Sequence, residues 1–177
     1  MIVFRQTDSR WPFLWETADQ PAGRWHGTGE GPAHYFADTP SGAWAEFLRH
    51  EEITNLDDLA TVRRRMWAID IGDRPADAIR LVEGVAAGGL DMWSRCQAEA
   101  RRLRASGSTR LNAPSAALKP GGARGVVVHQ GEHPGPLRDG RVIVVYGPPQ
   151  DLVGWLIAEQ AGPGPDLLDR VRHYGSG

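Results

Sequence analysis

The spacing of hydrophobic residues changes several times along this 177-residue chain. Hydrophobic positions recur every three or four residues over 41–50 and 91–105, which predicts two helices, the first largely buried and the second with charges opposite its hydrophobic stripe. A third, terminal helix is expected over 165–174. Short β-branched or alternating runs predict strands, and these runs cover residues 2–5, 34–37, 62–71, 109–113, 126–129, 141–146 and 155–160, with 76–81 as a short strand or a turn.

The residues before position 41 carry the signals of a helix start. Asp38 or Thr39 can cap the helix, and Pro40 suits its first turn because proline has no N–H to leave unpaired. The segment preceding it reads as strand, glycine-rich turn and strand. Glu46 lies on this helix, next to Phe47, where it can project toward the neighbouring strands.

The order of the elements predicts an α+β fold. Seven or eight strands and three helices do not alternate regularly, which favours a mostly antiparallel sheet with flanking helices. Gly27 and Gly29 are followed by Pro32 where a dinucleotide-binding fingerprint needs its third glycine. The pattern therefore argues against a doubly wound nucleotide fold, and the length fits a single domain over 1–177.

Composition narrows the functional classes. The chain has 20 basic and 22 acidic residues and a net charge of −2, which gives no support for direct nucleic-acid binding. One cysteine, Cys96, excludes an intrachain disulfide and a cysteine-based zinc site, and its place on a hydrophobic stripe predicts a packed thiol. No apolar run approaches roughly 18 residues and no secretory signal is evident, so we expect no membrane segment and a cytoplasmic location.

The polar residues show no standard metal or serine-hydrolase motif. The six histidines lack a metal-binding spacing; His129 and His133 bracket Glu132, a weak arrangement, and we expect no metal. Ser115 stands in APSAAL, which is not a nucleophile elbow. Its hydroxyl could face a ligand or cap a turn, and local grounds favour the turn.

The segment 23–50 holds the most informative group of residues. Arg24 directly precedes Trp25, and neighbours in an extended chain point to opposite faces, so a packed Trp25 would turn Arg24 toward a cleft. A guanidinium grips phosphate through two parallel hydrogen bonds, and a carboxylate such as Glu46 can hold a ribose hydroxyl and stabilise positive charge. The alternative is a surface salt bridge beside a core aromatic residue, Tyr35.

Several segments together resemble the RES domain family. The matching pieces are FR at Phe4, GRW around Arg24, HYFAD around Tyr35, AEFLRH around Glu46, and CQAEARRLRASG leading to LNAPSAAL with Ser115. They follow one another over residues 5 to about 130. Three details depart from the family pattern: His26 replaces an asparagine, the residues before Pro-Ser differ, and GGARGVVV replaces a later asparagine.

The resemblance implies both a fold and an activity. It implies an ADP-ribosyltransferase-like split sheet with an NAD+ cleft, and a toxin that consumes NAD+ by glycohydrolysis, phosphorolysis or ADP-ribosyl transfer. It also implies an Xre-type antitoxin that covers the site. Carried over by position, Arg24 would clamp a phosphate, Tyr35 would pack beside nicotinamide, Glu46 would stabilise the ribosyl cation, and Ser115 would bond ribose or phosphate. The alternatives are a transferase that modifies a protein target and a non-catalytic module that binds a nucleotide or a partner.

Overall fold

Seven strands form one sheet in this computed structural model, which describes residues 1–148 and 152–174. Neighbouring strands are antiparallel, apart from the parallel pair at one edge. In spatial order the strands are β4 (Asp77–Ala78), β5 (Arg110–Pro114), β8 (Arg141–Tyr146), β2 (Ala33–Ala37), β1 (Ile2–Thr7), β3 (Arg64–Asp70) and β9 (Val153–Ala161).

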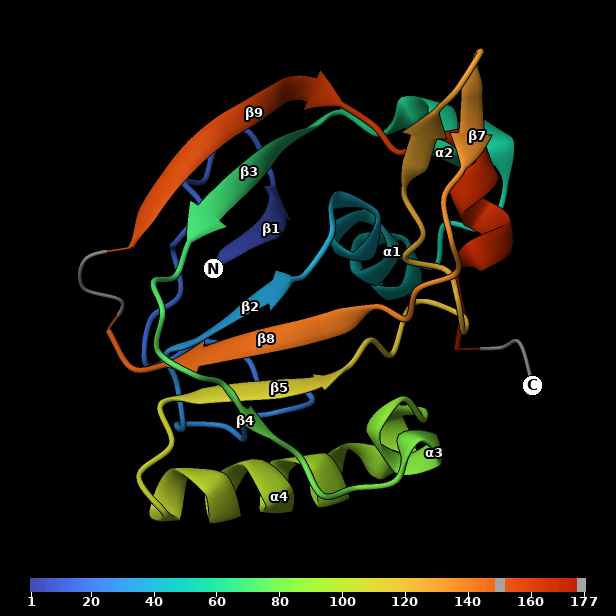
Figure 1. The fold of residues 1–177 in the computed structure, drawn as a ribbon. Helices are drawn as coiled ribbons and strands as arrows, with labels where there is room; N and C mark the ends of the chain where they lie inside the picture. Colours follow the sequence, from blue (N-terminus) through green and yellow to red (C-terminus); the bar gives the residue numbers. More distant parts are fainter. Residues whose placement is uncertain (149–151, 175–177) are drawn as a thin grey trace.

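The sheet is split between β1 and β2. These strands share one paired position, Phe4 with Ala37, whereas β1 pairs with β3 along its full length and β2 with β8 along its own. The two halves diverge from this point: β1, β3 and β9 arch away from β2, β8 and β5, and helix α1 (Pro40–His50) lies beside the opening (Figure 1). The expected α+β fold with a split, mostly antiparallel sheet is confirmed.

Helix α1 begins where the sequence signals place it. The Thr39 side chain accepts a hydrogen bond from the Gly42 N–H at 3.0 Å, and Pro40 occupies the first turn. Trp44 and Leu48 are buried in a core cluster together with Met66 of β3. Because packing holds the helix on this side, its remaining face is available to the opening of the sheet.

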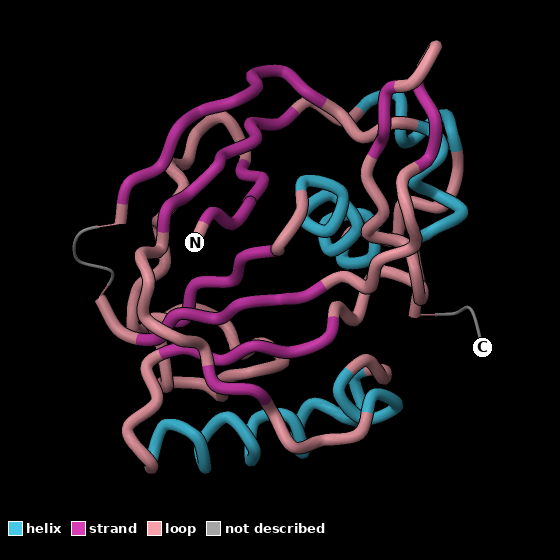
Figure 2. The backbone as a smooth tube through the Cα atoms, in the orientation of Figure 1, coloured by secondary structure: helices cyan, strands magenta, loops and turns pink. Residues whose placement is uncertain are grey.

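The other half of the sheet is covered by α4 (Trp93–Ala105), with the short helices α3 (Glu83–Ala86) and η1 (Leu90–Met92) before it. Figure 2 shows α4 running along this half, away from α1. Cys96 is fully buried against Trp25 and Leu111, so the prediction of a packed thiol is confirmed.

Several elements differ from the sequence prediction. Helix α2 (Leu56–Thr61) was not expected, because six residues are too few for a clear period; the Asn55 side chain caps it. The terminal helix expected over 165–174 is wrong in its second part: the structure has a 3₁₀ helix, η2 (Pro165–Arg170), which ends four residues earlier. The chain then extends and pairs with the Ser115 loop, where Arg172 N–H donates to the Ala117 carbonyl at 2.6 Å.

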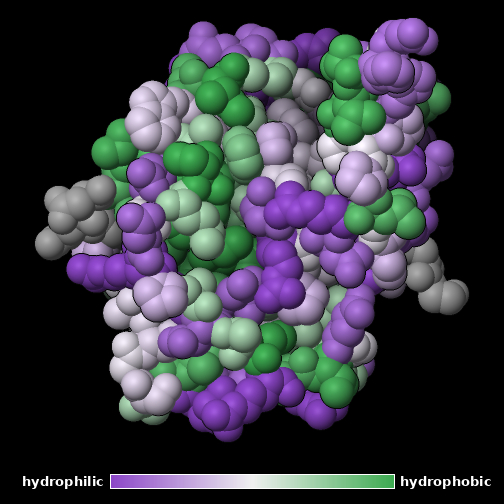
Figure 3. Space-filling model, in the orientation of Figure 1, coloured by the Kyte–Doolittle hydropathy of each residue, from purple (hydrophilic) through white to green (hydrophobic). Residues whose placement is uncertain are grey.

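A further difference is β7 (Glu132–Pro134), which pairs with β6 (Val126–Val128) in a hairpin separate from the main sheet. Hydrophobic side chains gather over this hairpin in Figure 3, and all three valines of β6 are exposed. Within residues 1–148 and 152–174, no helix combines the length and apolar character that crossing a bilayer demands.

Candidate functional site

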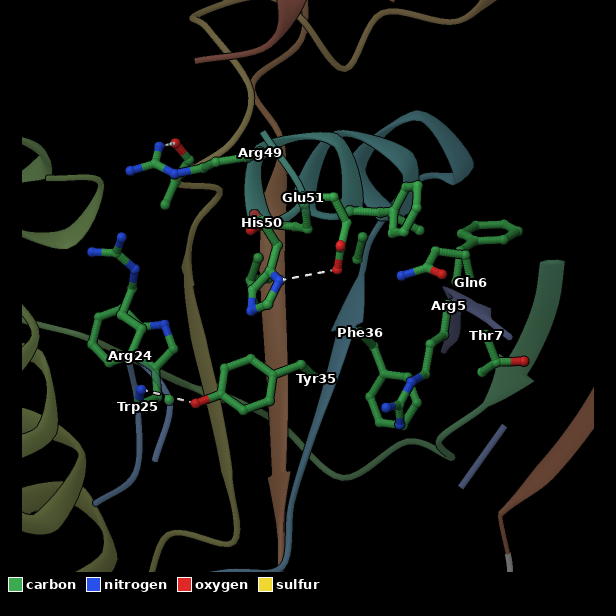
Figure 4. A pocket seen from close by; sticks show the side chains of 18 of the residues that line it. Arg5, Gln6, Thr7, Arg24, Trp25, Tyr35, Phe36, Arg49, His50 and Glu51 are labelled. Atoms are coloured by element: carbon green, nitrogen blue, oxygen red, sulfur yellow. Dashed lines mark hydrogen bonds and ion pairs between the residues drawn. The ribbon is translucent and has the colours of Figure 1, made fainter. Parts of the chain in front are cut away.

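A pocket of about 510 Å³ lies where the two halves of the sheet diverge. This volume falls within the roughly 300–1,000 Å³ that is usual for small-molecule sites. Strands β1 and β2, helix α1, the turn at 23–26 and the loop after β1 supply its walls. Figure 4 shows Arg24 at one side of it, Tyr35 and Phe36 in the middle, and Arg5 at the other side.

Arg24 stands in a tight turn, and the expected strand around it is wrong. Gly23 and His26 bridge each other, with the Gly23 N–H donating to the His26 carbonyl at 3.0 Å, so Arg24 and Trp25 are the two central residues. A Cβ on Gly23 would lie 2.8 Å from the Tyr35 hydroxyl oxygen, closer than real Cβ atoms come. Trp25 is buried as expected, and the turn directs Arg24 to the pocket.

The Arg24 guanidinium is held without a carboxylate. It is 9% exposed, and its nitrogens Nη1 and Nη2 donate to the carbonyls of Ala86 at 3.2 Å and Gly88 at 2.7 Å. Among the described residues no acidic group forms an ion pair with Arg24, Glu46 included, so the salt-bridge alternative does not describe this site. A buried cation that faces only neutral acceptors is well placed to attract an anion.

A second buried guanidinium, that of Arg49, meets the first. Its Nη2 donates to the same Gly88 carbonyl at 3.1 Å, and its Nη1 donates to the carbonyls of Ala116 and Arg172. The Arg49 Nε, although buried, lacks a hydrogen-bond partner in the described part of the chain, as does the indole nitrogen of Trp93, and both side chains line the pocket. Sequence reasoning missed Arg49, although it lies three residues after Glu46 and hence on the same helix face.

Glu46 is fixed through one oxygen. The Ser115 hydroxyl donates to Glu46 Oε1 at 2.8 Å and accepts from the N–H groups of Ala117 at 3.2 Å and Leu118 at 3.1 Å. The expectation of a turn-capping serine is therefore confirmed. Within the described residues nothing donates to Glu46 Oε2, so this second oxygen is available at the pocket that Glu46 lines.

Ser115 itself stands behind the pocket wall. Its neighbours Pro114 and Ala116 line the pocket, whereas Ser115 is 5% exposed and gives its one proton to Glu46. The geometry thus makes Ser115 a positioning residue for Glu46. A direct bond from Ser115 to ribose or phosphate stays a prediction.

The Tyr35 hydroxyl is also fully engaged. The Nε2 of His26 lies 2.9 Å from the Pro21 carbonyl, which can only accept, so Nε2 carries the proton of this ring. Burial lowers the pKa of His26 and raises that of Tyr35, so both are neutral and the Tyr35 hydroxyl donates to His26 Nδ1 at 2.9 Å. The same hydroxyl accepts from the Trp25 N–H, which leaves the ring of Tyr35 as its surface toward the pocket.

The opposite side of the pocket has a different character. Arg5 forms a partly buried ion pair with Glu16, and His34 Nδ1 lies 2.9 Å from Glu16 Oε2. Burial alone would raise the pKa of Glu16, but the hydrogen bonds from His34 and Arg5 outweigh it and lower the pKa to about 2. Trp11 and Trp15, in the loop after β1, line the pocket there and are 47% and 45% exposed.

Three of the four residues proposed from the sequence therefore share one pocket, and the fourth holds one of them in place. Within the described residues, no group of three or more histidine, cysteine, aspartate or glutamate side chains is placed so that it could bind a metal ion. The His133 Nε2 instead lies 2.9 Å from the carbonyl oxygen of His129.

Comparisons with known proteins agree with this architecture. The family model described as RES domain matches residues 3–153. A chain in the crystal structure of the M. tuberculosis MbcT-MbcA toxin-antitoxin complex superposes with a TM-score of 0.57 at 20% sequence identity, covering 95% of this chain and 86% of that one. At this identity the likeness shows the fold alone. Comparison with curated proteins gave no match.

Proposed function

This chain belongs to the RES domain family, and from that premise we propose that it is a toxin that consumes NAD+ by breaking the bond between nicotinamide and ribose. One observation carries the proposal: Glu46 lines the same pocket as Arg24, with Oε1 fixed by Ser115 and Oε2 unpaired among the described residues. Such a site can grip an anionic ligand and stabilise a cation formed beside it.

The anion would bind at the buried end of the pocket. Arg24 and Arg49 meet at the Gly88 carbonyl and have no carboxylate partner in the described part of the chain. Two close guanidiniums repel each other, and a pyrophosphate placed between them would relieve that repulsion through charge-assisted hydrogen bonds. The indole N–H of Trp93, which is buried and has no hydrogen-bond partner among residues 1–148 and 152–174, would add a third donor.

The bond-breaking step needs little acid catalysis. The bond between ribose C1′ and the pyridinium nitrogen breaks, its electron pair stays on that nitrogen, and neutral nicotinamide leaves. Positive charge then develops on C1′ and the ring oxygen, where a fixed carboxylate stabilises it more than water does because it needs no reorganisation. Glu46 would play this part, and the ring of Tyr35 would pack beside the departing nicotinamide.

The acceptor completes the reaction. Water would attack C1′ and lose a proton to give ADP-ribose, whereas inorganic phosphate would form a new C1′–O bond and give the 1-phosphate ester. A protein side chain as the acceptor would make the enzyme an ADP-ribosyltransferase.

We also propose an antitoxin as the partner, of the Xre type. The support is the family membership and the fold shared with a chain from a toxin–antitoxin complex. An inhibitor of this kind would be expected to cover the open side of the pocket.

The test is an NAD+ consumption assay on the purified protein. We expect loss of NAD+ with release of nicotinamide, and the products formed with and without added phosphate identify the acceptor. Label appearing on a protein instead of in solution would establish the transferase. Binding of NAD+ without any turnover, by protein that is folded, would contradict the catalytic proposal and leave a non-catalytic module.

A further inference from the structure

We propose that Trp11 and Trp15 form a platform that stacks a purine ring, so that the pocket takes the adenosine half of its ligand at this end. The inference rests on the proposed function for the identity of the ligand. It starts from two large indole side chains that are 47% and 45% exposed and that both line the pocket.

The two indoles are not needed to anchor their loop. Phe13 and Leu14 already pack against the core cluster around Val3, and the Phe13 ring lies 5.4 Å from that of Trp67. Backbone carbonyls fix the loop as well, because Arg5 donates to the carbonyl of Phe13 and the Thr7 hydroxyl to that of Trp11. The exposure of Trp11 and Trp15 therefore calls for a role other than packing.

The arrangement of the indoles suits a flat ring. Their centroids lie 5.7 Å apart with the planes tilted by 32°, and the Arg5 guanidinium lies over the Trp15 ring at 5.7 Å. They thus form a pair of adjacent aromatic side chains in the pocket wall, and a cation lies over one of them. Every nucleobase has a π-face that can stack on such a wall.

The position of Trp11 and Trp15 in the pocket indicates that the ring stacked on them is the purine of the adenosine half of the ligand. Arg24 lies at the other side of the pocket, where pyrophosphate would bind, and Tyr35 and Phe36 lie between Arg24 and Arg5 (Figure 4). Glu46, which is hydrogen-bonded to Ser115, belongs with that side because Arg49 donates to the carbonyl of the next residue, Ala116. A ligand with two ring systems joined by a pyrophosphate would place its second ring across this floor, at the indoles.

Calorimetry with ADP-ribose and with ribose 5-phosphate tests the platform without depending on turnover. The two probes differ by the AMP unit that carries the purine, so the change in their affinity ratio when the indoles are removed reports the stacking site. In Trp11→Ala/Trp15→Ala we expect this ratio to fall by about tenfold or more, the usual consequence of losing a base–aromatic stack. In Trp11→Ala/Trp15→Phe, which keeps one aromatic ring, we expect part of the wild-type affinity ratio to be restored.

Trp155→Ala is the matched control, because Trp155 is 51% exposed on β9 and is not part of the pocket wall. We expect it to leave the ratio at the wild-type value. An unchanged ratio in the double variant would overturn the purine platform, even if NAD+ is consumed. Absence of NAD+ turnover with an intact ratio effect would instead overturn the proposed chemistry and leave the platform in place.

Discussion

Arg24 and Arg5 line the same pocket but are held in opposite ways. Arg24 donates to two backbone carbonyls, whereas Arg5 forms a partly buried ion pair with Glu16. The charge of Arg5 is neutralised within the protein, and that of Arg24 is left for a ligand. The pocket therefore has one end that favours an anion and another that offers mainly aromatic surface. The partner of a buried arginine, more than its presence in a pocket, indicates what it does.

The largest effect should come from Glu46 at the anion-binding end. Glu46→Gln keeps the shape but removes the charge that stabilises the ribosyl cation, so we expect NAD+ turnover to fall by about a thousandfold or more, in the range typical of preorganised electrostatic groups. Initial rates of nicotinamide release measure this. Glu159→Gln, an exposed change on β9, serves as the control. Near-normal turnover in a folded Glu46→Gln protein would remove Glu46 from the mechanism.

Arg24→Lys tests whether binding needs the two parallel hydrogen bonds of a guanidinium or only its positive charge. A lysine places one point charge where the guanidinium bridges Ala86 and Gly88, so we expect kcat/KM for NAD+ to fall by about a hundredfold. Arg63→Lys, at an exposed arginine that also bonds backbone carbonyls, should show no such loss. If Arg24→Lys is as active as the wild type, the two-pronged grip on a phosphate is wrong.

Ser115→Ala should have a smaller effect, since it removes the group that holds Glu46 and not Glu46 itself. We expect kcat to fall about tenfold with KM nearly unchanged, and stability to drop by about 1–3 kcal/mol because the N–H groups of Ala117 and Leu118 lose their acceptor. Steady-state kinetics and thermal unfolding separate the two effects. A rise in KM alone would instead indicate that Ser115 contacts the ligand directly.

The last prediction concerns the Arg5–Glu16 ion pair at the other end of the pocket. Its loss should affect the stability of the fold more than NAD+ turnover. The pKa of Glu16 is lowered to about 2 in the folded protein, against an ordinary value of 4.5. Its stabilisation, about 3 kcal/mol by linkage, is complete above pH 4.5 and is lost as the pH falls toward 2. Denaturant unfolding measured between pH 7 and pH 2.5 should show this loss.

In Glu16→Gln we expect lower stability at pH 7, because Arg5 and His34 lose their buried partner, and a flatter dependence on acid pH. An equally steep acid dependence in this variant would mean that other carboxyl groups are responsible for it.

Much of the fold follows from the order of residues along the chain. The Thr39 cap and Pro40 fix the start of α1, the hydrophobic period fixes α4, and the β-branched run 141–146 fixes β8. These signals are local, because caps and periodicity act over one or two turns or a single strand. Elements of four to six residues, such as α2 and α3, carry too little of this signal to be recognised.

Residue types likewise led to Arg24, Tyr35 and Glu46, but the partners of Arg24 and Glu46 come from distant segments. Arg24 is bonded to residues more than sixty positions away, and Glu46 is held by Ser115 across a gap of 69 residues. The sequence by itself determined which chemistry the chain can provide. Only the tertiary structure decided which arginine has an acidic partner, that the Ser115 hydroxyl donates to Glu46, and that Trp11 and Trp15 remain exposed. Hydrogen bonding and burial depend on contacts between segments, and the order of residues along the chain does not specify these contacts.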